Sequence, residues 1–378
     1  ANTHSVANIE VYARKLAEAS EMRRVREAGR RISECDSYSE AQSLLSEAKP
    51  DQVARIKTAK EALKDMYEVL KARMESGDSI TGVPTGVDGL DQITSGYQPG
   101  NLIVLVGETS MGKSTLAMIH ALAAAKHAKE KGSGKVLYFS LEMTTTELLE
   151  REIAHLADFP LKWITKPADA PDQAAMRIAI GAKEAVNLPL IVDDRSGLTL
   201  EQIESMATQL HMQEEGGLTE IIVDYMHIMG RPRRNDVVEL GAIASGLKNL
   251  AKRLGVPVIA LHQLNRSVSD GKARRPTLDN IRASGEIAEA ANVVIAIYRS
   301  EIANPDFDSL HGYAEALVLK NRQGERNVRA WMTSRLGNMR LDSCDPPEGY
   351  DEKITPDKTP ESQPAGSGFR RKMPGSKF

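Results

Sequence analysis

From residue 102 onward, short apolar runs alternate with longer segments in which apolar residues recur every three or four positions. Apolar runs of this length are typical of buried parallel strands, and the periodic segments between them are typical of covering helices. The predicted strands are 102–106, 136–141, 190–192, 221–223, 256–261, 293–298 and 316–319. The predicted helices are 114–130, 145–157, 200–214 and 237–254. We therefore expect an α/β fold with a parallel central sheet.

The chain before this region has a helical pattern throughout. Apolar residues recur at helical spacing over 7–33, and Ser37 with Glu40 has the spacing of a capping box that opens a second, short helix. A third helix is predicted over 51–75. Its narrow apolar stripe consists of Ile56, Ala59, Leu63, Met66, Leu70 and Met74. Such a stripe fits one groove, either within its own domain or on a neighbouring subunit.

Composition limits the class of protein. The 378 residues are 41% hydrophobic and 27% charged, which is the ordinary range for a chain with a packed core. No apolar run approaches the roughly 20 residues of a membrane span, and a start without a signal sequence favours the cytoplasm. A net charge of −3 excludes a wholly basic nucleic-acid binder, but it permits a ring whose subunits each present a few cations to a central strand.

Other positions predict little chemistry. Residues 345–378 are rich in Pro, Gly, Ser and charge, so we expect a disordered tail that is either solvated or a weak tether for a partner or DNA. The eight histidines and two cysteines, Cys35 and Cys344, lack metal-ligand spacing. We expect free thiols and no structural zinc.

The strongest motif is GETSMGKST at 107–115, which satisfies GxxxxGK(S/T) between a predicted strand and a predicted helix. Backbone N–H groups of such a loop surround phosphate oxygens, and the helix N-terminus adds its positive end. Lys113 would reach the terminal phosphates, and Ser114 would hold Mg²⁺. The predicted phosphate loop consists of Gly107, Glu108, Thr109, Ser110, Met111, Gly112, Lys113, Ser114 and Thr115.

Three polar residues follow predicted strands, at the edge where ligands bind in parallel sheets. Glu142 could orient and deprotonate an attacking water, and Asp224 fits a Walker-B carboxylate that acts on Mg²⁺ through its water shell. Gln263 could sense the γ-phosphate by hydrogen bonding. Each alone could be an ordinary polar strand end, but their joint occurrence beside a phosphate loop indicates nucleotide hydrolysis.

A family resemblance rests on five segments of the sequence, which match in order and spacing. They are TGVPTGVDGLDQITSGYQPGNLIVLVGETSMGKST, FSLEM, IIVDYMHIM, VPVIALHQLNR and KNRQGERNV. They resemble the motifs of the DnaB-type replicative DNA helicases, a branch of the RecA-like ATPases. The resemblance covers nearly all of 7–342. It implies a RecA-like P-loop fold preceded by helices.

The same resemblance suggests the domain organisation. Residues 1–50 would be a helical hairpin remaining from the family's N-terminal domain, 51–80 a linker helix and connector, 81–344 the ATPase domain, and 345–378 the tail. By the resemblance, we expect this chain to lack the family's globular helical head. We expect either a shortened chain or a shorter, phage-encoded relative.

The resemblance also implies roles for individual residues. Glu142 would be the catalytic base, Asp224 the Walker-B residue, Gln263 the coupling sensor, and Arg151 an arginine near the nucleotide. Lys320 and Arg322 would act on the neighbouring subunit, with Arg322 as an arginine finger that neutralises transition-state charge. Without the resemblance, Lys320 and Arg322 would be interpreted as a solvated strand end.

DNA contact is expected from segment 275–292, which resembles a family segment containing a channel loop. The candidates for phosphate contact are Arg282, Ala283, Ser284 and Gly285. By the resemblance, the chain departs from the usual family pattern at Ala283, Ala288, Ala290 and Asn292, where we expect some loop-stabilising or DNA-contacting hydrogen bonds to be missing. It also departs at His227 and Thr109, where no group required for hydrolysis changes. Positive charge near the Walker-B strand comes from Arg231, Arg233, Arg234 and Arg253, of which Arg233 and Arg234 either extend the DNA channel or lie in a solvated loop.

Taken together, the resemblance implies an ATP- and Mg²⁺-dependent replicative DNA helicase. It would form a homohexamer around single-stranded DNA at the replication fork, move from 5′ to 3′, and work with a loader and a primase. The alternatives are a RecA- or RadA-type recombinase, a KaiC-like ATPase and a noncatalytic ATP-dependent scaffold. The order of FSLEM, VDY, HQLNR and KNR favours the helicase, and Lys113, Glu142 and Asp224 count against a scaffold.

Overall fold

The computed structural model describes residues 58–76, 80–226, 236–264, 275–278, 285–303 and 310–348, with isolated positions between 23 and 37. The chain divides into two compact units, Ala1–Gly77 and Asp78–Phe378. Most of the first two predicted helices, and the predicted tail from 349 onward, lie outside the described residues. The predicted domain boundaries at 50, 80 and 344 stay predictions. None of the helices in the described part is long and apolar enough to cross a membrane.

In the first unit, helix α3 (Ala59–Ser76) forms where the apolar stripe predicts it. Thr58 precedes the helix, and its backbone N–H donates to Glu61 Oε2 at 2.8 Å while Glu61 N–H donates to the Thr58 hydroxyl at 3.3 Å. This reciprocal pair satisfies two N–H groups that the first turn leaves without partners. The apolar side chains remain exposed, from 44% for Leu70 to 84% for Met74.

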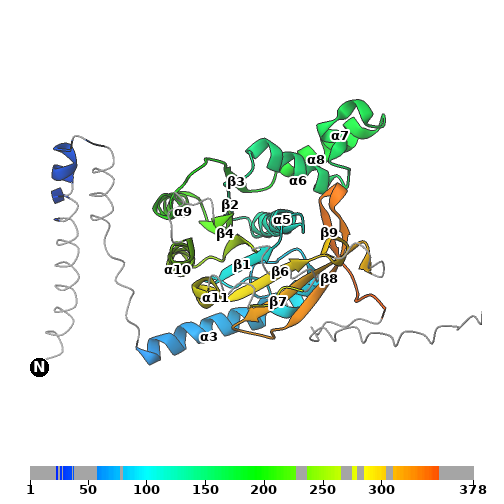
Figure 1. Ribbon diagram of the computed structural model, residues 1–378. Helices are drawn as coiled ribbons and strands as arrows, with labels where there is room; N and C mark the ends of the chain where they lie inside the picture. Colours follow the sequence, from blue (N-terminus) through cyan, green and yellow to red (C-terminus); the bar gives the residue numbers. More distant parts are fainter. Residues whose placement is uncertain are drawn as a thin grey trace, which may run out of the picture. The chain divides into compact units, whose positions relative to one another are not determined.

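The second unit is built on a mixed sheet, which has nine strands among the described residues (Figure 1). The strands are β1 (Leu102–Gly107), β2 (Lys135–Ser140), β3 (Leu190–Asp193), β4 (Leu218–Asp224), β5 (Val258–Gln263), β6 (Val293–Tyr298), β7 (Tyr313–Asn321), β8 (Val328–Arg335) and β9 (Arg340–Ser343). Their order is β3-β2-β4-β5-β1-β6-β7-β8-β9. Strands β3 to β6 in this order are parallel, and β7, β8 and β9 continue the sheet antiparallel.

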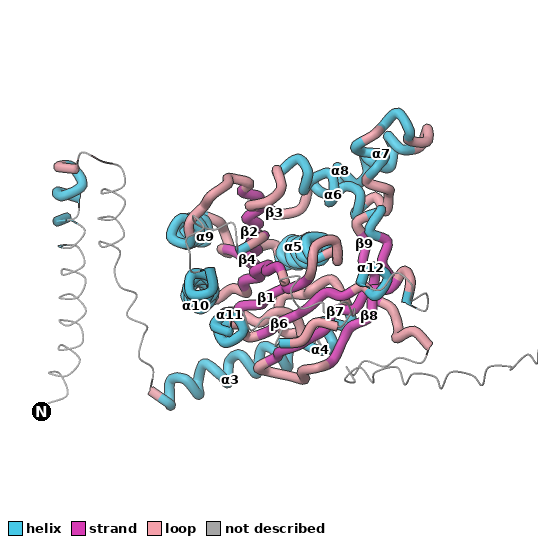
Figure 2. The backbone as a smooth tube through the Cα atoms, in the orientation of Figure 1, coloured by secondary structure: helices cyan, strands magenta, loops and turns pink. Residues whose placement is uncertain are grey.

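Helices cover both faces of the sheet. Figure 2 shows α5 (Lys113–Lys131) on one face and α9 (Leu200–Gln213), α10 (Asp236–Leu254) and α11 (Gly285–Ala290) on the other. Alternate residues of β1 point to different cores: Ile103 and Leu105 join the α5 side, whereas Val104 joins the α10 side. This two-sided burial explains why the strands are continuous apolar runs.

Further helices extend from this frame. Helix α4 (Asp88–Thr94) packs on β8, and α6 (Thr145–Leu156) packs on α8 (Ala174–Val186). The short elements are α7 (Lys162–Thr165), η1 (Pro167–Asp169), α12 (Ser300–Ala303) and η6 (Leu336–Asn338).

The predicted α/β class with a parallel central sheet is confirmed, but the prediction lacks strands β8 and β9 and helices α4, α7, α8, α11 and α12. Strand β8 was overlooked because Arg329 interrupts its apolar run, although that arginine is buried in an ion pair with Glu315 at 2.7 Å. Strand β9 is short, and α8 leaves apolar residues exposed, so neither has a clear burial pattern. Strand β5 begins at Val258 rather than at 256, because Pro257 has no N–H to donate to a ladder.

Candidate functional site

The phosphate loop joins the carboxyl end of β1 to the first turn of α5 (Figure 1). Gly112 is the N-cap of α5 with φ 99°, and Ser110 also has a positive φ of 69°. At Gly107 a Cβ atom would lie 2.8 Å from Ile297 Cγ2, so a side chain has no room there. The glycines therefore allow a tight loop at a helix N-terminus, which is the geometry that binds phosphate.

Lys113 lies at the start of α5. Its ammonium donates to the Gly107 carbonyl at 3.3 Å, across the loop. Burial lowers the pKa of Lys113, and the negative charges of Asp224 and Glu142 oppose that shift. The structure thus brings the predicted phosphate-binding cation and both predicted carboxylates to one place.

Asp224 is the last residue of β4 and is 2% exposed. Burial raises the pKa of this carboxyl, while hydrogen bonding from Ser114 and Tyr138 opposes the rise. The Tyr138 hydroxyl donates to Asp224 Oδ2 at 3.1 Å, and Oδ1 is buried without a partner in bonding geometry. A buried carboxylate oxygen without a protein partner, on a residue whose pKa is influenced by Ser114, suits an ion or its bound water.

Glu142 and Gln263 flank the same loop. Glu142 follows β2 by two residues and is exposed, so its carboxylate is accessible to a water molecule. Gln263 ends β5, and its side-chain amide donates to the Thr109 hydroxyl at 2.7 Å. We call the phosphate loop, together with Glu142, Asp224 and Gln263, the nucleotide edge.

Arg151 lies on α6, whose N-terminus is fixed by a capping box between Thr144 and Glu147. Its positive charge acts on Tyr138, lowering the pKa of that phenol against a larger effect of burial. The next residue, Glu152, is buried with Oε1 unpartnered, and burial raises its pKa to about 7. Arg151 therefore borders the side of the nucleotide edge that Tyr138 occupies.

The side chains of Lys320 and Arg322 bond to main-chain carbonyls near the end of α11 rather than to groups of the nucleotide edge. The Lys320 ammonium donates to the carbonyls of Ala288 at 2.6 Å and Ala291 at 2.8 Å. Arg322 Nη2 donates to the carbonyl of Glu289 at 2.6 Å. These carbonyls are at the C-terminal end of α11, where a helix leaves its last carbonyls unpaired and favours cations. We call this arrangement the α11 cap.

The sheet register separates the α11 cap from the nucleotide edge. Asn321, between the two cations, pairs with Val293 of β6, and Val293 pairs with Ile103 near the start of β1. The phosphate loop begins at Gly107, four residues further along β1, or about 13 Å at 3.3 Å per residue. The two cations therefore lie toward the opposite edge of the sheet from the phosphate loop of their own chain.

With this geometry established, the chain can be compared with known proteins. Residues 82–333 match the family described as the DnaB-like helicase C terminal domain. This chain belongs to the DnaB-like helicase family. The replicative DNA helicase DnaB of Haemophilus influenzae is 35% identical to it over 343 residues, which are 85% of this chain and 72% of that protein.

Solved structures share the fold. One of them, an isolated ATPase domain, has 26% identity and a TM-score of 0.69, covering 76% of this chain and 99% of that domain. A DnaB-like replicative helicase, solved in a study of its interactions with primase, has 23% identity and a TM-score of 0.75, covering 91% and 80%. The predicted RecA-like fold and family are confirmed, as is the enzyme class, an ATP-hydrolysing replicative DNA helicase.

The predicted DNA segment of this DnaB-like chain is described only in part. Arg282, Ala283 and Ser284 lie outside the described residues, and so do the arginines at 231, 233 and 234. Gly285 is the first residue of α11. Arg253 is described, and it forms an ion pair with Glu204, with Nη2 3.4 Å from Oε2.

Asn292, one of the positions expected to differ from the family pattern, accepts two hydrogen bonds within its own chain. Its Oδ1 accepts from Leu102 N–H at 3.1 Å and from the Lys248 ammonium at 2.6 Å. These bonds hold Asn292 to β1 and α10, and the expectation of missing loop-stabilising or DNA-contacting bonds stays a prediction.

Two residues near the phosphate loop were overlooked in the sequence. Arg299 directly follows β6 and donates to the Ser110 carbonyl at 3.3 Å, so it braces the loop from a parallel strand. The signal was available, because Arg299 ends a strand at the same edge as Asp224. Tyr138 carried no such signal, because an aromatic residue inside an apolar strand is indistinguishable from a core residue.

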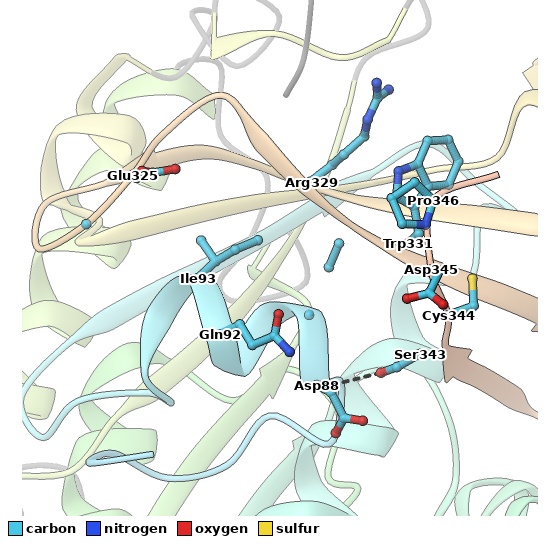
Figure 3. Close-up of a pocket in the computed structure, with 13 residues that line it drawn as sticks. Asp88, Gln92, Ile93, Glu325, Arg329, Trp331, Ser343, Cys344, Asp345 and Pro346 are labelled. Atoms are coloured by element: carbon cyan, nitrogen blue, oxygen red, sulfur yellow. Dashed lines mark hydrogen bonds between the residues drawn. The ribbon is translucent and has the colours of Figure 1, made fainter. Parts of the chain in front are cut away.

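A pocket of about 680 Å³ lies elsewhere on this unit, between α4, the β7–β8 turn and the segment after β9 (Figure 3). Asp88, Glu325 and Asp345 line it, and the backbone N–H of Asp88 donates to the Ser343 hydroxyl at 2.8 Å. Its lining includes no residue of the nucleotide edge. It is a separate feature from the phosphate loop.

Proposed function

We propose that this chain works as a homohexameric helicase, which uses ATP and Mg²⁺ to move along single-stranded DNA from 5′ to 3′ and to unwind a replication fork. The observation that carries the proposal is the separation between the nucleotide edge and the α11 cap. Lys320 and Arg322 lie about 13 Å along the sheet from their own phosphate loop, so a finger role requires a neighbouring subunit.

Within one subunit, the nucleotide edge supplies the groups for hydrolysis. The phosphate loop and Lys113 bind the phosphates, and the exposed Glu142 orients and deprotonates the attacking water. Gln263, already bonded to Thr109 of the loop, reports the state of the γ-phosphate to β5. Arg151 borders the nucleotide from α6.

A magnesium ion fits the residues present. Asp224 has a buried, unpartnered Oδ1, and the Ser114 hydroxyl lies close enough to this carboxylate to lower its pKa. Ser114 would ligate the ion directly, and Asp224 would bind its water shell. The bound ion would neutralise charge that develops on the phosphates.

The neighbouring subunit completes the site. Arg322 would leave the Glu289 carbonyl and stabilise transition-state charge on the adjacent nucleotide, with Lys320 beside it. Arginine fingers contribute about 10³- to 10⁵-fold to rate in other NTPases. Hydrolysis would consequently depend on the assembled ring.

Assembly and DNA contact involve two other segments. The exposed stripe on α3, which includes Leu63, Met66, Leu70 and Met74, would pack in a groove of the neighbouring subunit. Residues 282–285, immediately before the body of α11, would contact phosphates of the strand through Arg282 and backbone N–H groups. Because phosphates carry no base identity, binding would be independent of sequence.

Partners at the fork would be a loader and a primase. The primase proposal is supported by the solved DnaB-like replicative helicase of the same fold, which was studied for its interactions with primase.

The decisive experiment compares unwinding of forked DNA that carries only a 5′ or only a 3′ single-stranded tail, with ATP and Mg²⁺. We expect unwinding from the 5′ tail, hydrolysis stimulated by single-stranded DNA, and hexamers in electron micrographs. Unwinding from the 3′ tail alone would overturn the polarity. Strand exchange without unwinding would favour a recombinase, and nucleotide binding without hydrolysis would favour a scaffold.

A further inference from the structure

Tyr138 is a wholly buried polar side chain that the proposed reaction does not use. It lies on β2, with 0% of its surface exposed, and its hydroxyl donates to Asp224 Oδ2 at 3.1 Å. Tyr138 pairs in register with Ile222 of β4, so Asp224 is two residues nearer the carboxyl end. Both side chains lie on the α5 face, and the phenol therefore points along the sheet toward the nucleotide edge.

The two oxygens of the Asp224 carboxylate have unequal surroundings. Oδ2 accepts from Tyr138, while Oδ1 is buried and has no partner in bonding geometry. A carboxylate on a short side chain can rotate about its last torsion, which has broad preferences. A donor on one oxygen fixes that rotation and determines where the other oxygen points.

We propose that Tyr138 is a positioning residue for magnesium: its phenol holds Asp224 Oδ2 and so fixes the orientation of the carboxylate, which leaves Oδ1 for the water shell of an ion that Ser114 would ligate. This rests on the proposed function, in which Asp224 and Ser114 serve Mg²⁺. Tyr138 acts through Asp224 and touches neither the ion nor the nucleotide.

A phenol suits this task for chemical reasons. Tyrosine is a neutral donor at pH 7, so it orients the carboxylate without cancelling the charge that attracts a cation. The phenol is wholly buried, so deleting its hydroxyl removes the donor to Oδ2 at a place that bulk water does not reach. Outer groups that orient metal-binding side chains commonly affect metal affinity.

The test is Tyr138→Phe in the full chain, which removes one oxygen and keeps the ring. Mn²⁺ affinity of the ADP complex is measured by electron paramagnetic resonance, and the Mg²⁺ concentration for half-maximal ATP hydrolysis is measured in parallel. We expect metal affinity to fall about 3- to 10-fold, which is the effect of one buried hydrogen bond. Nucleotide affinity measured in EDTA should stay unchanged.

Tyr97→Phe is the matched control. Tyr97 is 1% exposed, and its hydroxyl lies 3.0 Å from His120 Nε2, so this variant also loses one buried hydrogen bond. Both variants should show a similarly lowered melting temperature, but Tyr97→Phe should bind Mn²⁺ as the wild type does. Equal loss of metal affinity in both variants would show general destabilisation and overturn the proposal.

Asp224→Asn separates this inference from the proposed function. If Asp224→Asn weakens Mn²⁺ binding and Tyr138→Phe leaves it unchanged, the positioning role is wrong and the metal role of Asp224 stands. If Asp224→Asn also leaves Mn²⁺ binding unchanged, the metal role of Asp224 is wrong, and the positioning role fails with it.

Discussion

The nucleotide edge and the α11 cap both gather charged side chains, but they engage them differently. At the nucleotide edge, Lys113 crosses a loop and faces the carboxylates of Asp224 and Glu142. At the α11 cap, Lys320 and Arg322 donate to main-chain carbonyls of a helix end. Lys113 donates to one loop carbonyl and has two carboxylates near it, whereas Lys320 and Arg322 hold several carbonyls at the end of one helix.

This difference indicates what must happen before the α11 cap can act on the nucleotide of a neighbouring subunit. Burial and the nearby Arg322 charge lower the pKa of Lys320, and the charge of Glu289 opposes that effect. A cation held by carbonyls is available elsewhere only after those bonds are exchanged for stronger ones, and a polyphosphate offers stronger acceptors. We infer that a finger role for Arg322 includes release of the C-terminal end of α11.

The largest effect is expected for Arg322→Ala. This variant should fold and bind ATP, but hydrolysis should fall by about 10³- to 10⁵-fold, because the transition state loses a charged partner. Phosphate release and ATP-analogue binding measure the two properties separately. Wild-type turnover would show that the α11 cap is purely structural.

Subunit mixing sharpens this test. In mixed rings, some interfaces join the intact phosphate loop of an Arg322→Ala subunit to the intact finger of a Lys113→Ala subunit. Those interfaces should regain hydrolysis. If mixing is verified and no activity returns, a crosslink from position 322 to the neighbour's nucleotide distinguishes action within one subunit from a ring that needs every site.

The next largest loss of ATP hydrolysis is expected for substitutions in the nucleotide edge. Glu142→Gln should bind ATP normally and hydrolyse it about 10²- to 10⁴-fold more slowly, because the amide cannot accept a proton from water. Lys113→Ala should instead lose ATP-dependent activity through loss of phosphate neutralisation. Normal turnover by Glu142→Gln would remove that residue from the role of base.

The sequence predicted that the parts of the nucleotide edge converge, because each part follows from a local rule. A phosphate loop has a defined spacing, and polar residues at the carboxyl ends of parallel strands must converge. The loop, Glu142, Asp224 and Gln263 were all identifiable in this way, and Arg299 could have been. Tyr138 could not, because its role depends on a diagonal contact between neighbouring strands.

The α11 cap could not be predicted from the sequence either, because it also depends on contacts between distant segments. Lys320 and Arg322 were singled out by family resemblance alone, and nothing local indicates that a helix about 30 residues earlier ends beside them. Strand β8 was not predicted because Arg329 interrupts its apolar pattern. That arginine is buried by an ion pair with Glu315 on β7, which depends on the register of the two strands. Long-range pairing determines both features, and a single sequence does not encode it as a periodic pattern.

A smaller effect concerns the pH dependence of folding stability, through Glu152 on α6. Glu152 has a folded-state pKa of about 7, above its usual 4.5, so the folded protein keeps a proton that the unfolded chain releases. The free energy of unfolding should therefore fall as pH rises from 4.5 to 7, by up to about 3 kcal/mol from this group. Glu152→Gln should remove this contribution. Urea unfolding at about pH 4.5 and pH 8 measures it, and identical pH dependence in both proteins would contradict the assignment.

The smallest effect is expected for Arg282→Ala, which tests whether the segment before α11 contacts DNA. Arg282 is three residues before the start of α11, so a phosphate contact there would join the DNA to the helix that Lys320 and Arg322 hold at its other end. Arg282→Ala should lower single-stranded DNA affinity by about tenfold and reduce the slope of log affinity against log salt by roughly one. DNA-free hydrolysis should be unchanged.

The matched control is Arg253→Ala. Because Arg253 already pairs with Glu204, this variant should leave the salt dependence of DNA binding unaltered. If Arg282→Ala keeps the wild-type slope, the DNA contact lies outside this region, and the arginines at 231, 233 and 234 become the candidates to substitute next.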